Sequence, residues 1–511
     1  MNAEDAHREF DVLVTASEAY PRLETEFLKA KQEIVAGFRI FDPETTLYSD
    51  EARDVGEIWA DLITHTLNRG VRIKIFTTDF DPVVRMDMHY YAWQCHHGLI
   101  AAGEASDQPE NLSVDTGLHP ARLGLLPRTV LWMRSVKEIR NQLHQLAKRV
   151  RVEDLLETAP QIKRLTRRVA GQLKPRLFPP PALVPVSHHQ KLAVFDETRL
   201  YIGGLDLNDR RFDTPEHQRD GPETWHDIQV LVTGQIAREA RNHLLTMDQA
   251  FHGHKVTRPE KLLRTLSAKR KFQLPYMSPK PVFSEIADAH RTAIGKSKQL
   301  IYFETQFFRD EALAQCLAAR AREIPDLDLI MMLPAAPEDI AFTDTWGPDA
   351  AFGEHLQTKC VSILQEAFAE RLFIGSPVQK RTKVTKGRDT HFDAPIIYLH
   401  AKVSVFDDHT GIVSSANLNG RSMSWDTEAG VATQTGAEVA QLKRRCFKHW
   451  LQDGFRQEFY NPRTALQAWS TLAATNTRCV PEERQGLVVP YNVQAAKEDA
   501  QFLPGVPPEM A

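Results

Sequence analysis

Two stretches, His189-Gln190-Lys191-Leu192-Ala193-Val194-Phe195-Asp196 and His400-Ala401-Lys402-Val403-Ser404-Val405-Phe406-Asp407, share the pattern His-x-Lys-x-x-x-x-Asp. Seven residues after each Asp comes a run of small residues, Gly203-Gly204-Leu205-Asp206 in the first copy and Ser414-Ser415-Ala416-Asn417 in the second. A motif gains weight when its context recurs with it. The repeat therefore predicts a chain made of two related halves.

The elements around the two motifs recur in the same order. The first half offers a helical stretch (22–33), an apolar run (34–41), a helical pattern (58–67) and a strand-like run (71–76). The second half offers a helix (284–295), a strand (300–303), a helix (310–322) and a strand (327–332). This alternation is typical of a largely parallel sheet covered by helices. Each half then closes with a strand, a Thr-Gly turn and an amphipathic helix.

The expected fold is therefore α/β, with two tandem α-β-α lobes related by a pseudo-twofold axis and an active site at their interface. The expected boundaries are a first lobe at 1–254 with an insertion at about 97–180, a linker at 255–280, a second lobe at 281–455, and a C-terminal tail at 456–511 that packs on the lobes. The basic, polar composition and the flanking prolines of 255–280 favour the linker.

Strand parity explains the spacing inside each motif. Side chains alternate between the faces of a strand, so His189 and Lys191 share one face while Asp196 points to the other. The second copy repeats this arrangement, and both Asp196 and Asp407 are predicted to be structural anchors. The small residues that follow allow the backbone to return close to the same place, bringing Asp206 and Asn417 toward the His/Lys pairs.

Two such faces packed about a twofold axis would form a cationic pocket suited to a phosphate. A neutral imidazole can attack phosphorus, and a protonated one can deliver a proton to the leaving oxygen. Lys191, Lys402 and Asn417 would hold the nonbridging oxygens, where charge develops. This chemistry requires neither a metal nor a cofactor, and none is expected.

The motifs and their flanks resemble the phospholipase D superfamily, and in particular its eukaryotic-type members. The flanks that carry the resemblance are Gly203-Gly204-Leu205-Asp206-Leu207, Trp225-His226-Asp227-Ile228, Ile301-Tyr302-Phe303-Glu304-Thr305-Gln306-Phe307-Phe308 and Asn417-Leu418-Asn419-Gly420-Arg421-Ser422. The resemblance covers roughly residues 20–455 and implies a bilobed fold, with His189 as nucleophile and His400 as general acid/base. Two positions depart from the general superfamily pattern: Asp206 stands in place of Asn, and Ser414 in place of Gly.

Several further residues are candidates for supporting roles. Asp227 and Glu428 hold equivalent places in the repeat, and a carboxylate on the far nitrogen of a catalytic His fixes its tautomer; surface ion pairs are the alternative. Glu304 and Gln306 share a strand face and are candidates for substrate contact, with satisfied core polar groups as the alternative. Ser415 is a third substrate-binding candidate.

Composition limits the partners and the compartment. The chain has 511 residues, a formal net charge of −4 and five cysteines without any Cys-x-x-Cys pair. The slightly acidic balance argues against a dedicated nucleic-acid binder, and the cysteines are expected to be reduced. The acidic amino terminus and the absence of a long apolar run favour a cytoplasmic or peripheral membrane location. The sequence does not exclude export by a route that needs no cleaved signal. It does not determine the oligomeric state, and a monomer is compatible with it.

The insertion differs in charge from the rest of the chain. Residues 134–176 hold 12 Lys/Arg and 4 Asp/Glu, with Val136, Ile139 and Leu143 at helical spacing and a second helical pattern through Ile162, Leu165 and Val169. Basic amphipathic helices bind anionic lipid, although a solvated face on docked helices would look the same.

The resemblance thus implies a phosphodiesterase that hydrolyses glycerophospholipids to phosphatidic acid and headgroup through a phosphohistidine. It acts at a membrane surface, with water or an alcohol as acceptor. Alternatives of the same superfamily are a cardiolipin synthase-type phosphatidyltransferase and a nuclease. A catalytically inactive lipid-binding scaffold is a third reading, which the intact His and Lys residues of both motifs disfavour.

Overall fold

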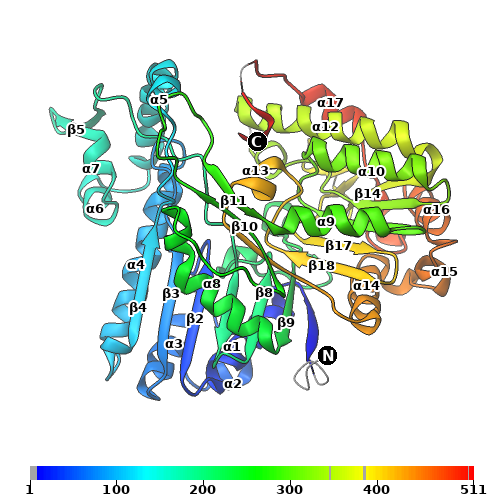
Figure 1. Ribbon diagram of the computed structural model, residues 1–511, viewed down its shortest axis with the longest axis horizontal. Helices are drawn as coiled ribbons and strands as arrows, with labels where there is room; N and C mark the ends of the chain where they lie inside the picture. Colours follow the sequence, from blue (N-terminus) through cyan, green and yellow to red (C-terminus); the bar gives the residue numbers. More distant parts are fainter. Residues whose placement is uncertain (1–7, 344–346, 384–386, 505, 511) are drawn as a thin grey trace.

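The apolar runs that flank the two motifs become the central strands of two separate sheets in the computed structural model, which describes residues 8–343, 347–383, 387–504 and 506–510 (Figure 1). The first sheet has seven strands in the order β1-β9-β8-β7-β2-β3-β4. Their bounds, in chain order, are β1 (Phe10–Val14), β2 (Glu33–Phe38), β3 (Arg72–Thr78), β4 (Leu112–Gly117), β7 (Leu192–Phe195), β8 (Arg199–Gly203) and β9 (Ile228–Thr233).

The second sheet has nine strands in the order β11-β10-β19-β18-β17-β12-β13-β14-β20. Their bounds are β10 (Leu262–Ala268), β11 (Lys280–Ser284), β12 (Leu300–Thr305), β13 (Asp328–Met332), β14 (Leu372–Pro377), β17 (Lys402–Phe406), β18 (Thr410–Ser414), β19 (Glu428–Ala432) and β20 (Val488–Pro490).

The two sheets share a common strand order. The run β9-β8-β7-β2-β3-β4 of the first sheet corresponds to β19-β18-β17-β12-β13-β14 of the second. In both, the strand that lies within the motif pairs antiparallel with its neighbours, β7 with β2 and β8, and β17 with β12 and β18. The parallel pairs β2/β3 and β12/β13 lie at equivalent places. The mixed α/β fold and its two sheet-containing halves agree with the expectation from sequence. The expectation of largely parallel sheets is wrong, because only β2/β3/β4 and β12/β13/β14 pair in parallel, and the strands after each motif return as antiparallel neighbours.

Helices cover the outer faces of both sheets and also fill the space between them. One core cluster joins the inner faces of the sheets with α8 (Gln235–Phe251) and α14 (Gly436–Leu451). The outer face of the first sheet packs on α1 (Ala16–Lys29) and α3 (Trp59–Asn68). The outer face of the second packs on α9 (Glu285–Lys296), α10 (Glu311–Glu323) and α12 (Pro348–Phe368). Since a single core spans both sheets, the halves are held in one arrangement.

The insertion forms a separate subdomain at one end of the first sheet (Figure 1). It contains α5 (Leu125–Leu146), α6 (Val152–Thr158), α7 (Ile162–Leu165) and the hairpin β5 (Thr166–Val169) and β6 (Gln172–Pro175), which pack with the start of α4 (Met86–Glu104) around a small core. The rest of α4 packs against the first half, and β4, although inside the expected 97–180 insertion, is a strand of the first sheet. The helical pattern predicted through Val169 is wrong at its end, because the chain turns at Ala170 and Gly171, both with positive φ, and Val169 pairs with Gln172.

The segment expected to be a linker, 255–280, contains β10 rather than an open connection. β10 pairs antiparallel with β19, so that residues 262–268 belong to the second sheet. Apolar residues of β10 such as Leu262 and Leu266 are buried in the shared core. The basic, polar composition of the surrounding residues concealed this strand from sequence reasoning.

The last part of the chain packs on the second half. It contains α15 (Gln457–Tyr460), α16 (Ala465–Asn476) and α17 (Val493–Asp499), and β20 adds to the sheet at the edge of β14. The remaining short elements are α2 (Asp50–Arg53), α11 (Glu338–Ala341), α13 (Gly420–Ser424), β15 (Thr390–His391) and β16 (Ala394–Pro395). Over the described ranges, no helix has both the length and the apolar character that crossing a membrane demands.

Candidate active site

Each motif histidine is fixed by backbone contacts with the opposite half. The N–H groups of His189 and Gln190 both donate to the carbonyl of Thr427, at 2.9 and 3.0 Å. In the other copy, the N–H of His400 donates to the carbonyl of His226 at 2.8 Å. The segment before β7 is thus bridged to the start of β19, and the segment before β17 to the start of β9. This reciprocal exchange brings the two histidines together.

The two imidazoles face one site and are oriented by carboxylates from the opposite half. The ring centroids of His189 and His400 are 6.4 Å apart. Nδ1 of His189 lies 3.2 Å from a carboxylate oxygen of Glu428 and 3.0 Å from the carbonyl of Ser415. Nδ1 of His400 lies 2.6 Å from Asp227. With Nδ1 engaged in this way, the Nε2 atom of each ring is left as the reactive nitrogen.

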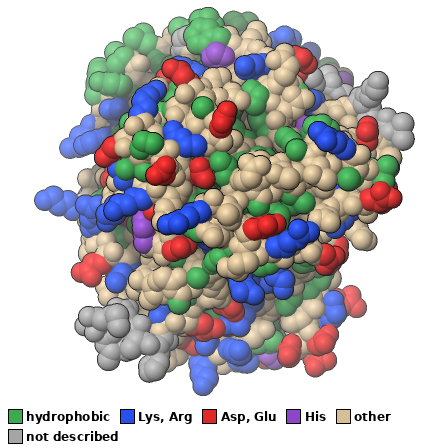
Figure 2. All heavy atoms as spheres, turned by 90° about the vertical axis from the view of Figure 1, so that its right-hand side faces the viewer, with side chains coloured by type: hydrophobic (Ala, Val, Ile, Leu, Met, Phe, Trp, Pro, Cys, Tyr) green, Lys and Arg blue, Asp and Glu red, His purple; other side chains and the backbone are tan. Residues whose placement is uncertain are grey.

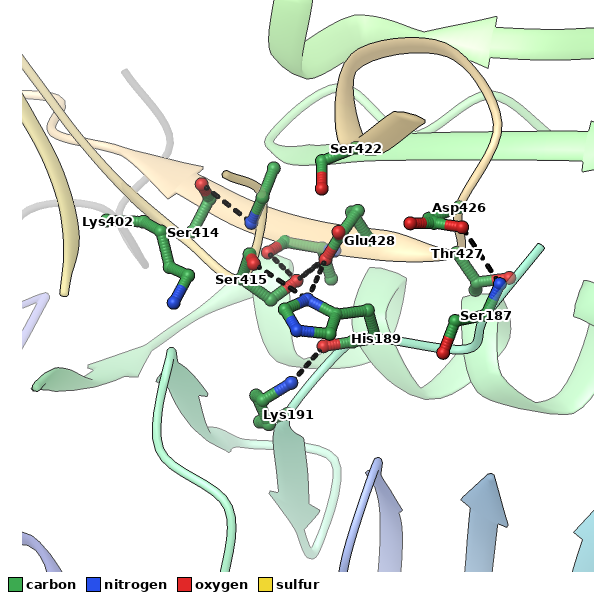
Figure 3. Close-up of polar contacts among 12 residues, drawn as sticks. Ser187, His189, Lys191, Lys402, Ser414, Ser415, Ser422, Asp426, Thr427 and Glu428 are labelled. Carbon is green, nitrogen blue, oxygen red and sulfur yellow. Dashed lines mark hydrogen bonds and ion pairs between the residues drawn. The ribbon is translucent and has the colours of Figure 1, made fainter. Parts of the chain in front are cut away.

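Lys191 and Lys402 both lie near the His189 imidazole (Figure 3), and the Lys402 ammonium is 2.9 Å from Nδ1 of His400. Lys191 is fully buried, and its ammonium donates to the carbonyl of His189. Lys402 makes the equivalent bond to the carbonyl of His400. Asp206 lies 3.8 Å from the Lys191 ammonium and also accepts the N–H of Ile40 at 3.0 Å. Two lysines and two imidazoles, one pair from each half, therefore lie around one buried site.

Asp196 and Asp407 point away from this site and hold the chain that leads into the central strands. Asp196 accepts backbone N–H bonds from residues 31–33 at 2.8–3.1 Å. Asp407 accepts the equivalent bonds from residues 298–300 at 2.7–2.9 Å. Both aspartates have positive φ, so each carboxylate sits at a tight turn and ties it to the start of β2 or β12.

Burial and the nearby positive charges shift the ionisation of the whole group. Burial first, and then the lysine charges, lower the pKa of His189 and of His400 well below its usual value. Burial also lowers the pKa of Lys402 to about 7. Burial raises the pKa of Asp227 to about 6 and that of Glu428 to about 8. In the empty site, burial thus favours the neutral forms of the histidines, of Lys402 and of the two carboxyl groups. An anion bound among the lysines would favour the protonated, cationic forms of the histidines and of Lys402 again.

Small residues make room for the orienting carboxylates. A Cβ at Gly204 would lie 2.2 Å from Oδ1 of Asp227. At the equivalent place in the second copy, the Ser415 hydroxyl donates to Glu428 and Ser422 lies nearby (Figure 3). Ser415 thus contacts the orienting carboxylate, whereas the sequence had made it a candidate for substrate contact. Asn417 is buried, and its Oδ1 has no hydrogen-bond partner among the described residues.

Glu304 and Gln306 are placed in the core rather than at the imidazoles. The Glu304 carboxylate is fully buried and accepts from Tyr302 at 2.7 Å and from His226 at 3.1 Å. The Gln306 amide donates to the Tyr398 hydroxyl at 2.7 Å. Because both oxygens of Glu304 are already occupied, its contacts are those of a satisfied core group, and the structure gives no support to the expected substrate contact.

Sequence reasoning missed Arg211 and the part played by Trp225. The Trp225 ring lies 4.6 Å from the His400 ring, measured between centroids, and the Arg211 guanidinium lies 3.5 Å from the centre of the Trp225 ring. Arg211 is mostly buried, and its Nε and one terminal nitrogen have no partner among the described residues. The pair of arginines after Asp209 was the only signal of it in the sequence. Besides burial, the charge of Arg211 also lowers the pKa of His400.

These features define a mixed α/β protein whose two repeats each supply a His, a Lys and an orienting carboxylate to one shared site. The sequence model of the family described as "Cardiolipin synthase, PLD-like domain" matches residues 290–450. Residues 290–450 thus match that family, and the chain is similar to members of the phospholipase D superfamily.

Individual relatives are distant. Phospholipase D1 of Schizosaccharomyces pombe is 22% identical over 348 residues, covering 48% of this chain and 24% of that protein. Phospholipase D alpha 4 of Arabidopsis thaliana is 24% identical over 353 residues, covering 48% of this chain and 45% of that protein. The chain thus spans less than half the length of these two relatives.

Among solved structures, phosphatidylserine synthase from Haemophilus influenzae aligns with a TM-score of 0.50 at 12% identity. The alignment covers 94% of this chain and 96% of that one. At this identity the likeness shows the fold alone.

Proposed function

We propose that the protein is a phospholipase D-type phosphodiesterase that hydrolyses glycerophospholipids to phosphatidic acid and a free headgroup, and that also transfers the phosphatidyl group to alcohols. One observation carries the proposal: two imidazoles lie 6.4 Å apart between their ring centroids, each with Nδ1 on a carboxylate or carbonyl of the opposite half. Such a pair can act as nucleophile and as acid on the same phosphorus.

In the first step, Nε2 of His189 attacks phosphorus and the ester bond to the headgroup oxygen breaks. His400 gives the proton on its Nε2 to that oxygen, and the headgroup leaves as an alcohol. The new P–N bond makes the His189 ring cationic, and Glu428 stabilises that charge through Nδ1. Lys191 and Lys402 hold the nonbridging oxygens, where negative charge accumulates during the reaction.

In the second step, His400 works in reverse. It removes a proton from water, whose oxygen attacks phosphorus while the P–N bond breaks. His189 returns to its neutral form, and the product is phosphatidic acid. An alcohol in place of water would give a phosphatidyl alcohol by the same route. Asp227 keeps the proton of the His400 ring on Nδ1 whenever Nε2 is unprotonated, so that Nε2 is free to accept the proton of the attacking group.

An exposed apolar patch supports a membrane lipid as the substrate. It is formed by the start of α5, the residues after β6 and the loop before β11. The most exposed members are Leu125, Leu126, Val130, Met133, Leu177, Phe178, Phe272 and Leu274. Hydrogen bonds from Leu126 N–H to the Leu274 carbonyl and from the Trp132 indole to the Leu177 carbonyl hold the three segments together. Grouped apolar side chains of this kind mark a surface that meets a membrane or a protein.

Charge next to the patch favours an anionic lipid surface. Arg134, Lys137 and Arg140 are on α5 with the patch residues, in the segment whose local charge is +8 by the count of 12 Lys/Arg against 4 Asp/Glu in residues 134–176. Basic amphipathic helices are attracted to such surfaces. By contrast, the face in Figure 2 carries positive and negative side chains interspersed, which is not the continuous basic stripe of a nucleic-acid binder.

A phosphatidyltransferase of the cardiolipin synthase type is the second candidate. The match of residues 290–450 to a family described by that name favours it. The chemistry of the site is common to both functions, because only the acceptor differs. The acceptor is then the hydroxyl of a second lipid or of a headgroup alcohol instead of water.

A product assay tests these functions. Purified protein is incubated with vesicles of phosphatidylcholine, phosphatidylethanolamine or phosphatidylglycerol, with and without ethanol, and the lipids are separated. Phosphatidic acid, replaced in part by phosphatidylethanol when ethanol is added, is the expected product. Cardiolipin formed from phosphatidylglycerol would favour the second candidate. The first is wrong if no lipid is cleaved while a nucleic-acid substrate is.

Variants of the two histidines assign their roles. His189→Ala should abolish turnover and any acid-labile phosphoenzyme. His400→Ala should lower kcat about 10²–10⁴-fold and lead to accumulation of the phosphoenzyme when the leaving group needs no proton. His290→Ala is a matched control, since His290 is buried on α9 and bonds to Ser404 at 2.9 Å outside the site. Label on the His189→Ala protein would reverse the assignment.

A further inference from the structure

A second group of histidines lies in the core behind the active site. His217, His226 and His449 form this histidine cluster, and one ring nitrogen of each lies within 4.8 Å of the others. His217 and His226 are fully buried and His449 nearly so. His217 lies between β8 and β9, His226 lies just before β9, and His449 is on α14.

Carboxylates fix the tautomers of two of these rings. Nδ1 of His217 lies 2.6 Å from Asp213, and Nε2 of His226 lies 3.1 Å from Glu304. A carboxylate accepts, so each of these nitrogens carries the proton and the other nitrogen of the neutral ring presents a lone pair. The lone pairs are therefore on Nε2 of His217 and Nδ1 of His226. The latter atom is buried without a hydrogen-bond partner among the described residues.

The third ring completes a donor set. Nε2 of His449 lies 3.1 Å from Nε2 of His217. Two nitrogens bound to one tetrahedral zinc ion at 2.0–2.1 Å are about 3.3 Å apart. A single hydrogen bond between the two Nε2 atoms would leave Nδ1 of His226 unsatisfied, whereas one cation would satisfy all three nitrogens. A histidine ligand whose other nitrogen bonds to a carboxylate is the usual arrangement around zinc.

We propose that His217, His226 and His449 bind a Zn²⁺ ion, with Asp213 and Glu304 holding two of the rings in place. His449 also lines a surface depression, which gives the ion a path from solvent; its charged side chains are of both signs, Glu18, Glu216 and Asp453 with Arg445 and Lys448. A water molecule from this depression would supply the fourth ligand.

The ion would stabilise the segment that orients His400. His226 precedes Asp227, and its backbone bonds both to the Tyr398 carbonyl at 2.9 Å and to the His400 N–H at 2.8 Å. The zinc would thus connect this segment to α14, which belongs to the other half. The phosphoryl transfer described above uses none of the three ligands, so the two proposals stand independently.

Metal analysis without any substrate tests the proposal. Full-length protein is loaded with ZnCl₂, dialysed against metal-free buffer and analysed for metal, with an expected content of about one zinc per chain. X-ray absorption of this sample should show three imidazole nitrogens at about 2.0–2.1 Å. Asp213→Asn should weaken zinc binding about 10–100-fold.

His449→Gln separates metal binding from hydrogen bonding. Its amide can still donate to Nε2 of His217, but it should lose the zinc, whereas His290→Gln, at a buried histidine outside the cluster, should keep it. Wild-type protein that retains less than about a tenth of a zinc per chain overturns the proposal. So does equal zinc in His449→Gln, or an absorption spectrum dominated by oxygen or sulfur ligands. If His449→Gln fails to fold, the wild-type absorption spectrum decides.

Discussion

At the scale of single residues, the two orienting carboxylates differ in length and their surroundings differ to match. Asp227 is short and reaches His400 directly because Gly204 leaves space beside it. Glu428 is one methylene longer, and the Ser415 hydroxyl occupies the equivalent position and donates to it. Each small-residue run is thus adapted to the carboxylate that it faces.

Gly204→Ala should lower kcat about 10²-fold, because the added methyl group would lie 2.2 Å from Oδ1 of Asp227 and displace it from His400. Steady-state kinetics with a phospholipid substrate measure the effect. Gly295→Ala is the control, since a Cβ there meets no atom within 4 Å. An unchanged kcat in Gly204→Ala would show that Asp227 does not position His400.

The pH dependence of kcat/KM should show the loss of a lysine charge. Burial lowers the pKa of Lys402 to about 7, so the free enzyme loses this cation as the pH rises through that value. The value of kcat/KM reports on the free enzyme. It should decline as the pH rises through the lowered pKa of His400, which must carry the transferred proton, and should fall more steeply above pH ~7, where the Lys402 charge is lost as well. Below it Lys402 is charged, and the lowered pKa of His189 keeps the nucleophile neutral. A profile that rises steadily from pH 6 to pH 9, roughly, would contradict this.

At the scale of elements, each half has a pair of facing residues on neighbouring strands where only one residue can carry a side chain, and the two halves place the glycine on opposite strands. Gly203 on β8 pairs with Gln229 on β9, and a Cβ at 203 would lie 1.7 Å from the Gln229 amide oxygen. In the second half Ser414 on β18 pairs with Gly430 on β19, where a Cβ would lie 2.6 Å from Cβ of Ser414. The glycine of this pair is on β8 in the first half and on β19 in the second half. Ser414 therefore fits in place of the usual Gly, because its partner Gly430 has no side chain.

The turn that ends each motif should contribute measurably to stability. Asp196→Asn leaves one neutral oxygen where a carboxylate accepts three backbone N–H groups, and should lower the free energy of unfolding by about 1–3 kcal/mol. Urea unfolding followed by circular dichroism measures it, with the exposed Asp107→Asn as control. Equal transitions in the two variants would show that Asp196 is dispensable for the turn.

At the scale of the whole molecule, the apolar patch should control attachment to membranes. The triple change Val130→Ser, Met133→Ser and Phe178→Ser removes side chains that are 84%, 69% and 74% exposed. Affinity for anionic vesicles should fall at least about tenfold, since each apolar side chain buried in a membrane contributes roughly 1.5–3 kcal/mol. Cosedimentation measures it.

Phe502→Ser is the control for this experiment, because Phe502 is 61% exposed near the C-terminus, outside the patch. Hydrolysis of a soluble short-chain phospholipid should be unchanged in the triple variant, since the patch contains no residue of the active site. Vesicle binding equal to that of the wild type would show that the patch serves another purpose.

Much of the architecture could be predicted because the same motif and the same order of elements occur twice in the sequence. The repeated motif located His189 and His400 and the equivalent positions of Asp227 and Glu428. The sequence could not show which carboxylate orients which histidine, because each histidine contacts the carboxylate of the opposite half and this pairing depends on how the two halves pack. It also missed β10, whose surroundings are polar, and Arg211, whose contact with Trp225 joins residues of one loop only after folding.

The reciprocal bridges between residues 188 and 427 and between 226 and 399 have a consequence for concentration. In a site shared by two separate subunits, the fraction of complete sites falls on dilution. Here both halves belong to one chain, so their association is intramolecular. Its effective concentration does not change when the protein is diluted. Specific activity should therefore stay constant on dilution, and a fall on dilution would show that a second chain contributes to the site.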